Sequence, residues 1–373
     1  MSPLAPIEKP AVGIIANPAS GRDVRRLVAK ASVFHTAEKS NMVQRALTAL
    51  ASCGVRSAVM TRDLGGIAGG VLRALETHRA LPSAPWPSVT FLDLPIEDSA
   101  IDSVRAVDRM LELGVALILV LGGDGTHRVI AGRCGSIPLV ALSTGTNNAF
   151  PEIREATIAG LAAGLIATGA VSREAGTVRN KVLRVRMNGE ERDLALVDVC
   201  ASRDHWTGAR AVWKPEDLTE LFVTTARADA IGLSAIAGLT HPVERSAQQG
   251  VRLKLCPVGE GIMTVRAPIA PGLIAPVGIA EIGTMHPGEE HMLEKRRGVL
   301  ALDGEREIEF GPESRLSVSL HLDGPLTVDI GRVMRLAVEQ GLFAEQVRHR
   351  PAEYHEIYST APDQPTEETW QPH

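Results

Sequence analysis

Short apolar runs alternate with amphipathic stretches through the first 150 residues, and this alternation constrains the fold more than any other feature. Apolar runs of strand length occupy residues 12–16, 55–60, 89–92, 115–121 and 138–142. Helical spacing of apolar residues predicts helices over 42–50, 65–78 and 101–113, with a further helical stretch after Asp23. Strands that alternate with helices pair in parallel through right-handed crossovers, and such sheets bind ligands at the carboxyl ends of their strands.

The pattern changes to a period of two after about Arg179. Apolar and polar residues then alternate in KVLRVRMNG, VRLKLC, IMTVRA, VLALDG, EREIEF and RLSVSLHLDG. This alternation is typical of antiparallel strands with one buried face. We expect one helix within this part, over Glu216–Ala228, and a final helix over Arg332–Leu342 that returns to the first domain.

The predicted fold class is therefore α/β, with an N-terminal parallel-sheet domain and a C-terminal β-rich domain. We expect the first domain to comprise residues 8–150 together with a returning helix within 331–350, and the second to comprise 151–330. Residues 351–373 are polar and contain prolines, which predicts a flexible tail.

Charge and composition argue against nucleic acid and membranes as partners. The net charge is −5, no long basic run occurs, and aromatic residues make up only 3% of the chain. Nucleic acids and anionic membranes bind largely through basic residues, and single-strand binders need aromatic stacking platforms. The longest uncharged stretch, Ala156–Val171, has 16 residues and contains three glycines. It is shorter than the roughly 20 apolar residues that a membrane-spanning helix requires, so we expect no stable membrane insertion.

The cysteines and the N-terminus predict a cytoplasmic protein. Four cysteines lie far apart without a CxxC pair, which is typical of reduced thiols. The first ten residues lack the apolar segment of a secretory signal. The histidines show no HExxH spacing, and His286 and His291 flank an acidic, turn-prone segment. We therefore expect no metal site built by the protein alone.

The strongest candidate for chemistry is the turn Gly122-Gly123-Asp124-Gly125-Thr126, which directly follows a buried strand. Glycines allow backbone amides to approach a phosphate closely, and the dipole of a helix starting near Thr126 favours an anion. Among such amides, the carboxylate of Asp124 can accept a proton from a hydroxyl or organise Mg²⁺. The alternative is a tight strand-to-helix turn in which Asp124 is a cap. The sequence contains neither a P-loop nor the spacing G-x-G-x-x-G.

Two more polar turns follow predicted strands. One contains Asn17, Ser20 and Gly21; the other runs from Ser143 through Thr144, Gly145, Thr146, Asn147 and Asn148. Each alone would be an ordinary turn or loop. Because carboxyl ends of parallel strands share one edge of a sheet, we expect the three turns to form one binding site.

These three turns resemble those of a known superfamily. The set I-I-x-N-P-x-S-G, G-G-D-G-T and G-T-x-N is similar to that of NAD kinases and of the diacylglycerol and sphingosine lipid kinases. Within it, NPASGRDVRRL and VFHTAEKSNMVQRAL resemble the acetoin catabolism protein X group of ATP-NAD kinase-like proteins. The resemblance implies a nucleotide-binding α/β domain, an acceptor-side β-rich domain, and a site in the cleft between them.

The resemblance also implies roles for individual residues. Asp124 would be the catalytic carboxylate, and Gly122, Gly123, Gly125 and Thr126 would hold nucleotide phosphates. Asn17, Ser20, Gly21 and the turn from Thr144 to Asn148 would line the nucleotide pocket. ATP would be the cofactor, with Mg²⁺ delivered with the nucleotide, and the 2′-hydroxyl of the adenosine ribose of NAD would be the acceptor.

Two segments of the second domain also match the superfamily. Ala195-Leu196-Val197-Asp198-Val199 resembles the A-L-N-E-V segment of NAD kinases, with Val197 in place of the asparagine. Asp303-Gly304-Glu305 resembles the D-G-E motif of lipid kinases, although Asp-Gly is also a preferred hairpin turn. Asp198 is equally interpretable as a structural residue, and Arg128 is interpreted as a solvated helix residue rather than a phosphate ligand.

The sequence therefore predicts an ATP-dependent, NAD kinase-like phosphotransferase, linked through its resemblance to NADP biosynthesis and acetoin catabolism. Two alternatives stay open: a lipid or small-alcohol kinase of the same superfamily, and a nucleotide-binding sensor without turnover. The resemblance allows a homo-oligomer, and the oligomeric state stays open.

Overall fold

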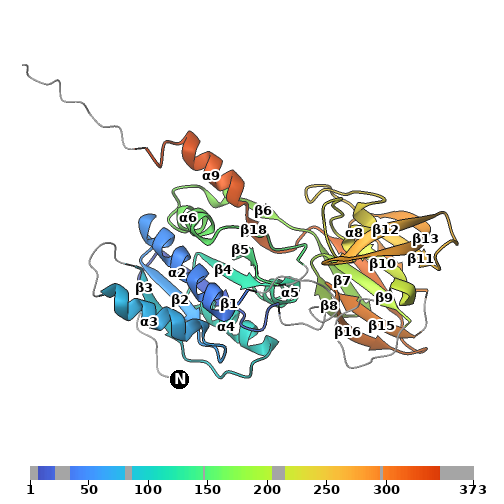
Figure 1. Cartoon of the computed structure of the whole chain (residues 1–373), viewed down its shortest axis with the longest axis horizontal. Helices are drawn as coiled ribbons and strands as arrows, with labels where there is room; N and C mark the ends of the chain where they lie inside the picture. The colour runs from blue at the N-terminus through green and yellow to red at the C-terminus, as the bar shows by residue number, and fades with distance from the viewer. Residues whose placement is uncertain are drawn as a thin grey trace, which may run out of the picture.

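The computed structural model of the chain describes residues 7–21, 34–79, 86–145, 148–203, 215–294 and 297–344. Three predictions lie outside these ranges: the helical stretch after Asp23, the tail from 351 to 373, and the placement of Thr146 and Asn147. Figure 1 shows an N-terminal α/β part beside a C-terminal β-rich part. The α/β fold class with these two parts is confirmed.

The first part is built on a seven-stranded sheet in the order β3-β2-β1-β4-β5-β18-β6. Its parallel strands are β1 (Ala11–Ala16), β2 (Ser57–Thr61), β3 (Ser88–Leu92), β4 (Leu117–Gly122) and β5 (Leu139–Ser143). Two short strands from later in the chain extend the sheet, β6 (Thr177–Arg179) and β18 (Leu326–Val328). The predicted apolar runs are therefore the strands of this sheet.

Helices cover both faces of the first sheet. One face packs against α2 (Thr36–Ser52), α3 (Ile67–Arg79), α6 (Ala156–Ala167) and α9 (Ile330–Glu339). The other face packs against α4 (Ala100–Glu112) and α5 (Asp124–Ala131). In β4, Leu117, Leu119 and Leu121 point to the first core, while Ile118 and Val120 point to the second. Burial on both faces explains why β4 has an unbroken apolar sequence.

The packing favours a domain boundary later than residue 150. Helix α6 belongs to the first core, and the short helix α7 (Arg173–Gly176) leads directly into β6. Residues 182–187 enter the core of the second part. We therefore propose a boundary near residue 180, with β18 and α9 returning to the first domain.

The second part contains two antiparallel sheets. The larger has the order β12-β13-β11-β10-β9-β15-β16, and the smaller has the order β14-β17-β7-β8. Leu183 on β7 and Val318 on β17 meet Phe222 on β10 and Leu300 on β15 in a core between the sheets. A second core lies between the larger sheet and the short helix α8 (Ser234–Gly238). The bounds of the strands are β7 Val182–Met187, β8 Glu190–Ala195, β9 Asp198–Ser202, β10 Leu218–Val223, β11 Gly250–Cys256, β12 Met263–Ala270, β13 Leu273–Met285, β14 Glu290–Met292, β15 Gly298–Leu302, β16 Glu305–Phe310 and β17 Leu316–His321.

The helix expected over Glu216–Ala228 is wrong. A single 3₁₀ turn, η1 (Pro215–Asp217), is followed by β10, which pairs with β9 on one side and β11 on the other. All six residues of β10 are buried because both faces of this central strand are covered. A strand buried on both faces loses its two-residue alternation, and its apolar spacing then resembles that of a helix. Among the described helices, none is long and apolar enough to cross a membrane.

Candidate functional site

The three polar turns meet at the carboxyl ends of β1, β4 and β5. The Asn17 Nδ2 donates to Thr126 Oγ1 at 2.8 Å, which joins the first turn to the second. The hydroxyls of Ser20 and Thr144 lie 2.8 Å apart, which joins the first turn to the third. The structure thus brings together the described members of the predicted site from three separate segments.

Two glycines are required for this close packing. A Cβ atom built on Gly145 would lie 2.8 Å from the Cα of Gly123 and 2.5 Å from the Asn148 Oδ1. A Cβ atom on Gly122 would lie 2.6 Å from the Cβ of Thr126. Such distances are far below van der Waals contact. Gly145 therefore allows the third turn to approach the second, and Gly122 leaves room for the Thr126 side chain within the second turn.

Lys39 holds the first turn in place, and our sequence analysis missed it. Its side chain is 1% exposed, and its Nζ donates to the carbonyl oxygens of Asn17, Pro18 and Ser20 at 2.9, 3.2 and 2.8 Å. Lys39 lies on the buried face of α2, three and four residues before Met42 and Val43. A lysine at this helical spacing, within an apolar face, is the signal that could have identified it.

Asp124 begins α5 and binds the loop that follows β5. Its Oδ1 accepts from the amide of Phe150 at 2.9 Å, and its Oδ2 accepts from the amide of Ala149 at 3.1 Å. The side chain is mostly buried, with the residue 8% exposed. The N-cap residue of α5 is Gly123, which has no side chain, so no side chain caps the first amides of this helix. Uncapped amides at a helix N-terminus favour an anionic ligand.

His127 lies on the buried side of α5. Its Nδ1 lies 2.8 Å from the carbonyl oxygen of Gly123, and its ring is tilted against that of Phe150. Complete burial lowers the pKa of His127 to about 4, with the Gly123 hydrogen bond opposing this shift. The imidazole is therefore neutral at physiological pH and packs as part of the fold.

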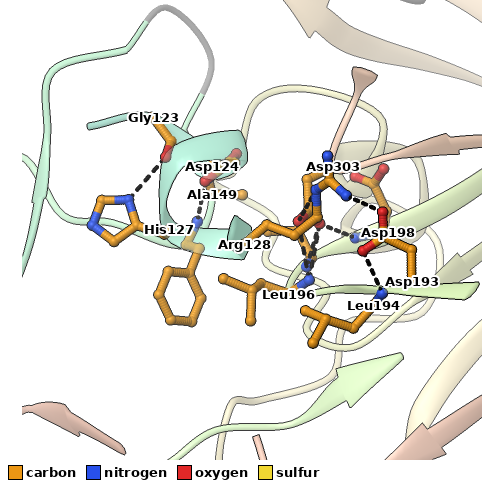
Figure 2. A network of polar contacts seen from close by, with 12 residues as sticks. Gly123, Asp124, His127, Arg128, Ala149, Asp193, Leu194, Leu196, Asp198 and Asp303 are labelled. Carbon is orange, nitrogen blue, oxygen red and sulfur yellow. Dashed lines mark hydrogen bonds and ion pairs between the residues drawn. The ribbon is translucent and has the colours of Figure 1, made fainter. Parts of the chain in front are cut away.

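Arg128 is buried and paired, so its interpretation as a solvated helix residue is wrong. Figure 2 shows its guanidinium between Asp193 and Asp303. The Arg128 Nη1 lies 2.6 Å from the Asp193 Oδ2, and its Nε lies 4.0 Å from the Asp303 Oδ2. α5 faces β8 of the smaller sheet, so the neighbouring domain covers this arginine (Figure 1). The spacing of residues within one helix cannot show that another domain buries one of its side chains.

Asp303 lies in a hairpin turn and also anchors the segment that resembles A-L-N-E-V. The turn joins β15 to β16, with positive φ angles of 51° at Asp303 and 79° at Gly304. Its carboxylate accepts from the amides of Leu196, Val197 and Asp198 at 3.1, 2.7 and 3.2 Å. Burial raises the pKa of Asp303 to about 6, against the opposing effects of Arg128 and of the three amides.

The other candidates of the second domain lie around this turn. Asp198 is 4% exposed at the start of β9 and its carbonyl accepts from the Asp303 amide at 2.9 Å. Val197 is 5% exposed beside it. Glu305 approaches the glycine turn of the first domain, since a Cβ atom on Gly125 would lie 3.2 Å from the Glu305 Oε1. The two domains therefore meet at the GGDGT turn.

A cavity of about 840 Å³ opens at this meeting point. The predicted site residues that line it are Asn17, Ser20, Gly21, Gly123, Asp124, Gly125, Thr126, Gly145, Asn148, Asp303 and Glu305. Gly122, Thr144, Asp198 and Gly304 are not among its lining residues; Asp198 and Gly304 instead line a small separate cavity that Asp124 also borders. A second cavity, of about 450 Å³, shares Asn148 with the first and is lined by Val197. Both volumes lie in the range of ligand pockets.

The described lining of the larger cavity is acidic. Eight carboxylates and four arginines border it: Asp63, Asp98, Asp102, Asp124, Glu191, Asp193, Asp303 and Glu305, with Arg62, Arg128, Arg133 and Arg192. Within the described ranges, no three His, Cys, Asp or Glu residues are grouped so that they could hold a metal ion by themselves. A polyphosphate in this cavity would need a cation to offset the carboxylates.

Comparisons with known proteins match both halves of the chain. Residues 12–171 match the profile of the ATP-NAD kinase N-terminal domain, and residues 181–323 match that of the acetoin catabolism protein X C-terminal domain. The acetoin catabolism protein X of Cupriavidus necator is 45% identical over 332 residues, which cover 88% of this chain and 92% of that protein.

Among solved structures, the chain is similar to the crystal structure of yeast NADH kinase complexed with NADH. The TM-score is 0.48 and the sequence identity is 14%, with 92% of this chain and 90% of that chain covered.

Proposed function

This chain belongs to the acetoin catabolism protein X family, whose members are NAD kinase-like, and from that premise we propose that it is an ATP-dependent phosphotransferase. The observation that carries the proposal is the position of Asp124. Its carboxylate borders the larger cavity, at the turn where three strand ends of the first domain meet the hairpin of the second. A buried acceptor at such a junction can bind a hydroxyl group and receive its proton as a phosphoryl group is transferred.

The larger cavity supports the binding of a nucleotide. The glycine turns leave backbone within reach of a ligand, and the uncapped amides of α5 provide donors for a phosphate. The excess of carboxylates in the lining opposes free ATP, whereas Mg²⁺ bound to the phosphates would offset that excess. In the proposal, ATP therefore enters as its magnesium complex.

NAD is the first acceptor to test, with its adenosine 2′-hydroxyl directed at Asp124. A second candidate, a nucleotide sensor without turnover, is favoured by Val197, an apolar residue in the lining where NAD kinases have an asparagine. A lipid kinase role is less favoured, because the Asp303 carboxylate that resembles the lipid-kinase motif is already bound by three backbone amides.

Binding and turnover can be measured on one sample. NAD, NADP and ATP are titrated separately by calorimetry with Mg²⁺ present, and NADP formation is then assayed. Micromolar binding with NADP produced supports an NAD kinase. Binding without product favours the sensor or another acceptor, and the absence of binding by every nucleotide would contradict the proposed function.

Asp124→Asn tests the catalytic role. The amide keeps the size of the side chain but cannot take a proton, so we expect turnover to fall at least about 100-fold while ATP affinity stays within a few fold. Asp323→Asn is the matched control, because Asp323 pairs with Arg184 at the surface and neither residue lines the cavity. If Asp124→Asn keeps most of the turnover, Asp124 is a structural link to residues 149–150 and the role is wrong.

A further inference from the structure

The smaller cavity is lined by a buried lysine and a partly buried arginine close to Asp124. Lys181 lies between β6 and β7, where the chain passes from the first domain to the second, and is 4% exposed. Arg245 comes from the segment before β11. Both side chains line the cavity of about 450 Å³.

Both cations are held by neutral partners. The Lys181 Nζ donates to the carbonyl oxygens of Glu244 and Gln249, each at 2.9 Å. An ammonium group has three N–H donors, so one of them is left for a ligand. The Arg245 Nη2 donates to the carbonyl oxygen of Phe150 at 3.0 Å, and the guanidinium carbon lies 5.4 Å from the centre of the Phe150 ring. Among the residues that the structure describes, no carboxylate lies within 4.0 Å of either cation.

This pair of like charges is costly in the free protein. Burial lowers the pKa of Lys181 to about 8, and the positive charge of Arg245 acts in the same direction. Burial also lowers the pKa of Arg245, while Glu152, Asp329 and Asp124 oppose that change from beyond ion-pair distance. Two cations withdrawn from water without a counterion are unfavourable, and an anion between them would offset that cost.

The same cavity provides an uncharged donor. Ser234 is 1% exposed, lines the cavity, and its hydroxyl has no hydrogen-bond partner within the described part of the chain. Buried hydroxyls are normally hydrogen-bonded, so an unpaired one beside two cations indicates a position for a ligand oxygen.

The cation pair is coupled to the carboxylate of the proposed mechanism through a single residue. Phe150 receives the Arg245 hydrogen bond at its carbonyl oxygen and donates its amide to the Asp124 Oδ1 at 2.9 Å. A ligand group bound at Arg245 would therefore be held at a short, fixed separation from Asp124.

We propose that the phosphoryl acceptor carries an anionic oxygen group, a phosphate or a carboxylate, which binds between Lys181 and Arg245 with the Ser234 hydroxyl as a further donor. This inference rests on the proposed function and restricts the chemical class of its phosphoryl acceptor. It selects hydroxyl compounds that also carry an anion, a class that includes NAD through its pyrophosphate. It disfavours uncharged alcohols and uncharged lipids, which would leave both cations without a counterion.

The test measures anion binding separately from turnover. Inorganic pyrophosphate and succinate, as phosphate and carboxylate probes, are titrated by calorimetry into the wild type and the variants Lys181→Met and Arg245→Met. We expect at least one probe to bind the wild type and to bind each variant at least about tenfold more weakly. Magnesium-ATP is titrated in parallel, and its affinity in the variants should stay within about threefold, because the larger cavity lacks both residues.

Control variants separate loss of charge from loss of folding. Lys254→Met removes a surface lysine that pairs with Glu281 and Glu294, and it should leave binding of the probes unchanged. Arg245→Lys keeps the charge and should bind the probes more tightly than Arg245→Met, while thermal unfolding shows that each variant is folded. If Lys181→Met does not fold, the comparison of Arg245→Met with Arg245→Lys decides the question.

The outcomes distinguish this inference from the proposed function. Probe binding that depends on Arg245, without phosphoryl transfer to any anionic acceptor, would support the anion site and contradict the kinase. Turnover on uncharged alcohols that is insensitive to Arg245→Met would support the kinase and contradict the anion site. No binding of either probe to the wild type, or unchanged binding in folded Arg245→Met, would overturn the anion site.

Discussion

At the scale of single residues, Asp303 shows how burial and hydrogen bonding oppose each other at one carboxylate. Three successive amides and the guanidinium of Arg128 favour its charged form, yet complete removal from water raises its pKa to about 6. The carboxyl group therefore changes charge within the range of ordinary buffers, and its protonation affects the free energy of unfolding.

The sign of that effect follows from the raised pKa. The folded protein binds the Asp303 proton more tightly than the unfolded chain, whose aspartate titrates near 3.8. The Asp303 carboxyl group therefore contributes fully to the free energy of unfolding below about pH 4. This contribution, on the order of 2–3 kcal/mol, is lost as the pH rises through about 6. Urea unfolding of the wild type and of Asp303→Asn between pH 4 and 7.5 measures this change. Relative to the variant, the wild type should lose stability over that interval; parallel curves would contradict the assignment.

At the scale of elements, glycines decide how closely α6 packs on α2. A Cβ atom on Gly160 would lie 2.8 Å from the Ala49 Cβ and 2.9 Å from the Ala46 Cα, and one on Gly164 would lie 2.5 Å from the Cys53 Cβ. The sequence showed these glycines only as interruptions in an apolar stretch. In the structure they form the contact surface of a buried helix pair.

Gly160→Ala should separate these two helices. Because the new methyl group would meet the backbone of α2, we expect the free energy of unfolding to fall by about 1–2 kcal/mol despite the better helix propensity of alanine. Gly69→Ala in α3 is the control, since its Cβ would lie 3.8 Å from its nearest neighbour, the Arg73 Nη1. That variant should be neutral or slightly stabilising. Equal effects of the two substitutions in urea unfolding would argue against close packing at Gly160.

At the scale of the whole molecule, Arg128 connects the two domains. It projects from α5 of the first domain to Asp193 on β8 and to Asp303 in the β15–β16 turn of the second (Figure 2). The arginine side chain is 7% exposed and that of Asp303 is fully buried. Removing one partner from such a group leaves a buried charge uncompensated.

Arg128→Met should therefore weaken the association of the domains. We expect a loss of about 2–4 kcal/mol in the free energy of unfolding, with the two domains unfolding in separate steps. Arg133→Met provides a comparison just beyond the end of α5, where the arginine pairs with Asp108 of the same domain and both side chains are exposed. Its cost should stay below about 1 kcal/mol. A single transition of unchanged midpoint for Arg128→Met would show that the domains are held together by other contacts.

The sequence by itself determined those features that depend on neighbouring residues. The apolar runs of β1, β4 and β5 and the helical face that begins at Met42 follow from local periodicity, because strand and helix each repeat over a few residues. The site turns were predictable for the same reason: glycine and polar residues directly after strands identify strand ends, and parallel strands place those ends at one edge.

Only the tertiary structure decided which side chains are covered by distant parts of the chain. The burial of β10 on both faces removed the alternation that would have identified it as a strand, and cover from the second domain made Arg128 a buried ion-pair partner. Lys39 and the pair Lys181 and Arg245 were likewise missed. A charged side chain indicates exposure in sequence, whereas its real environment depends on carbonyl groups and cavities contributed by residues far along the chain.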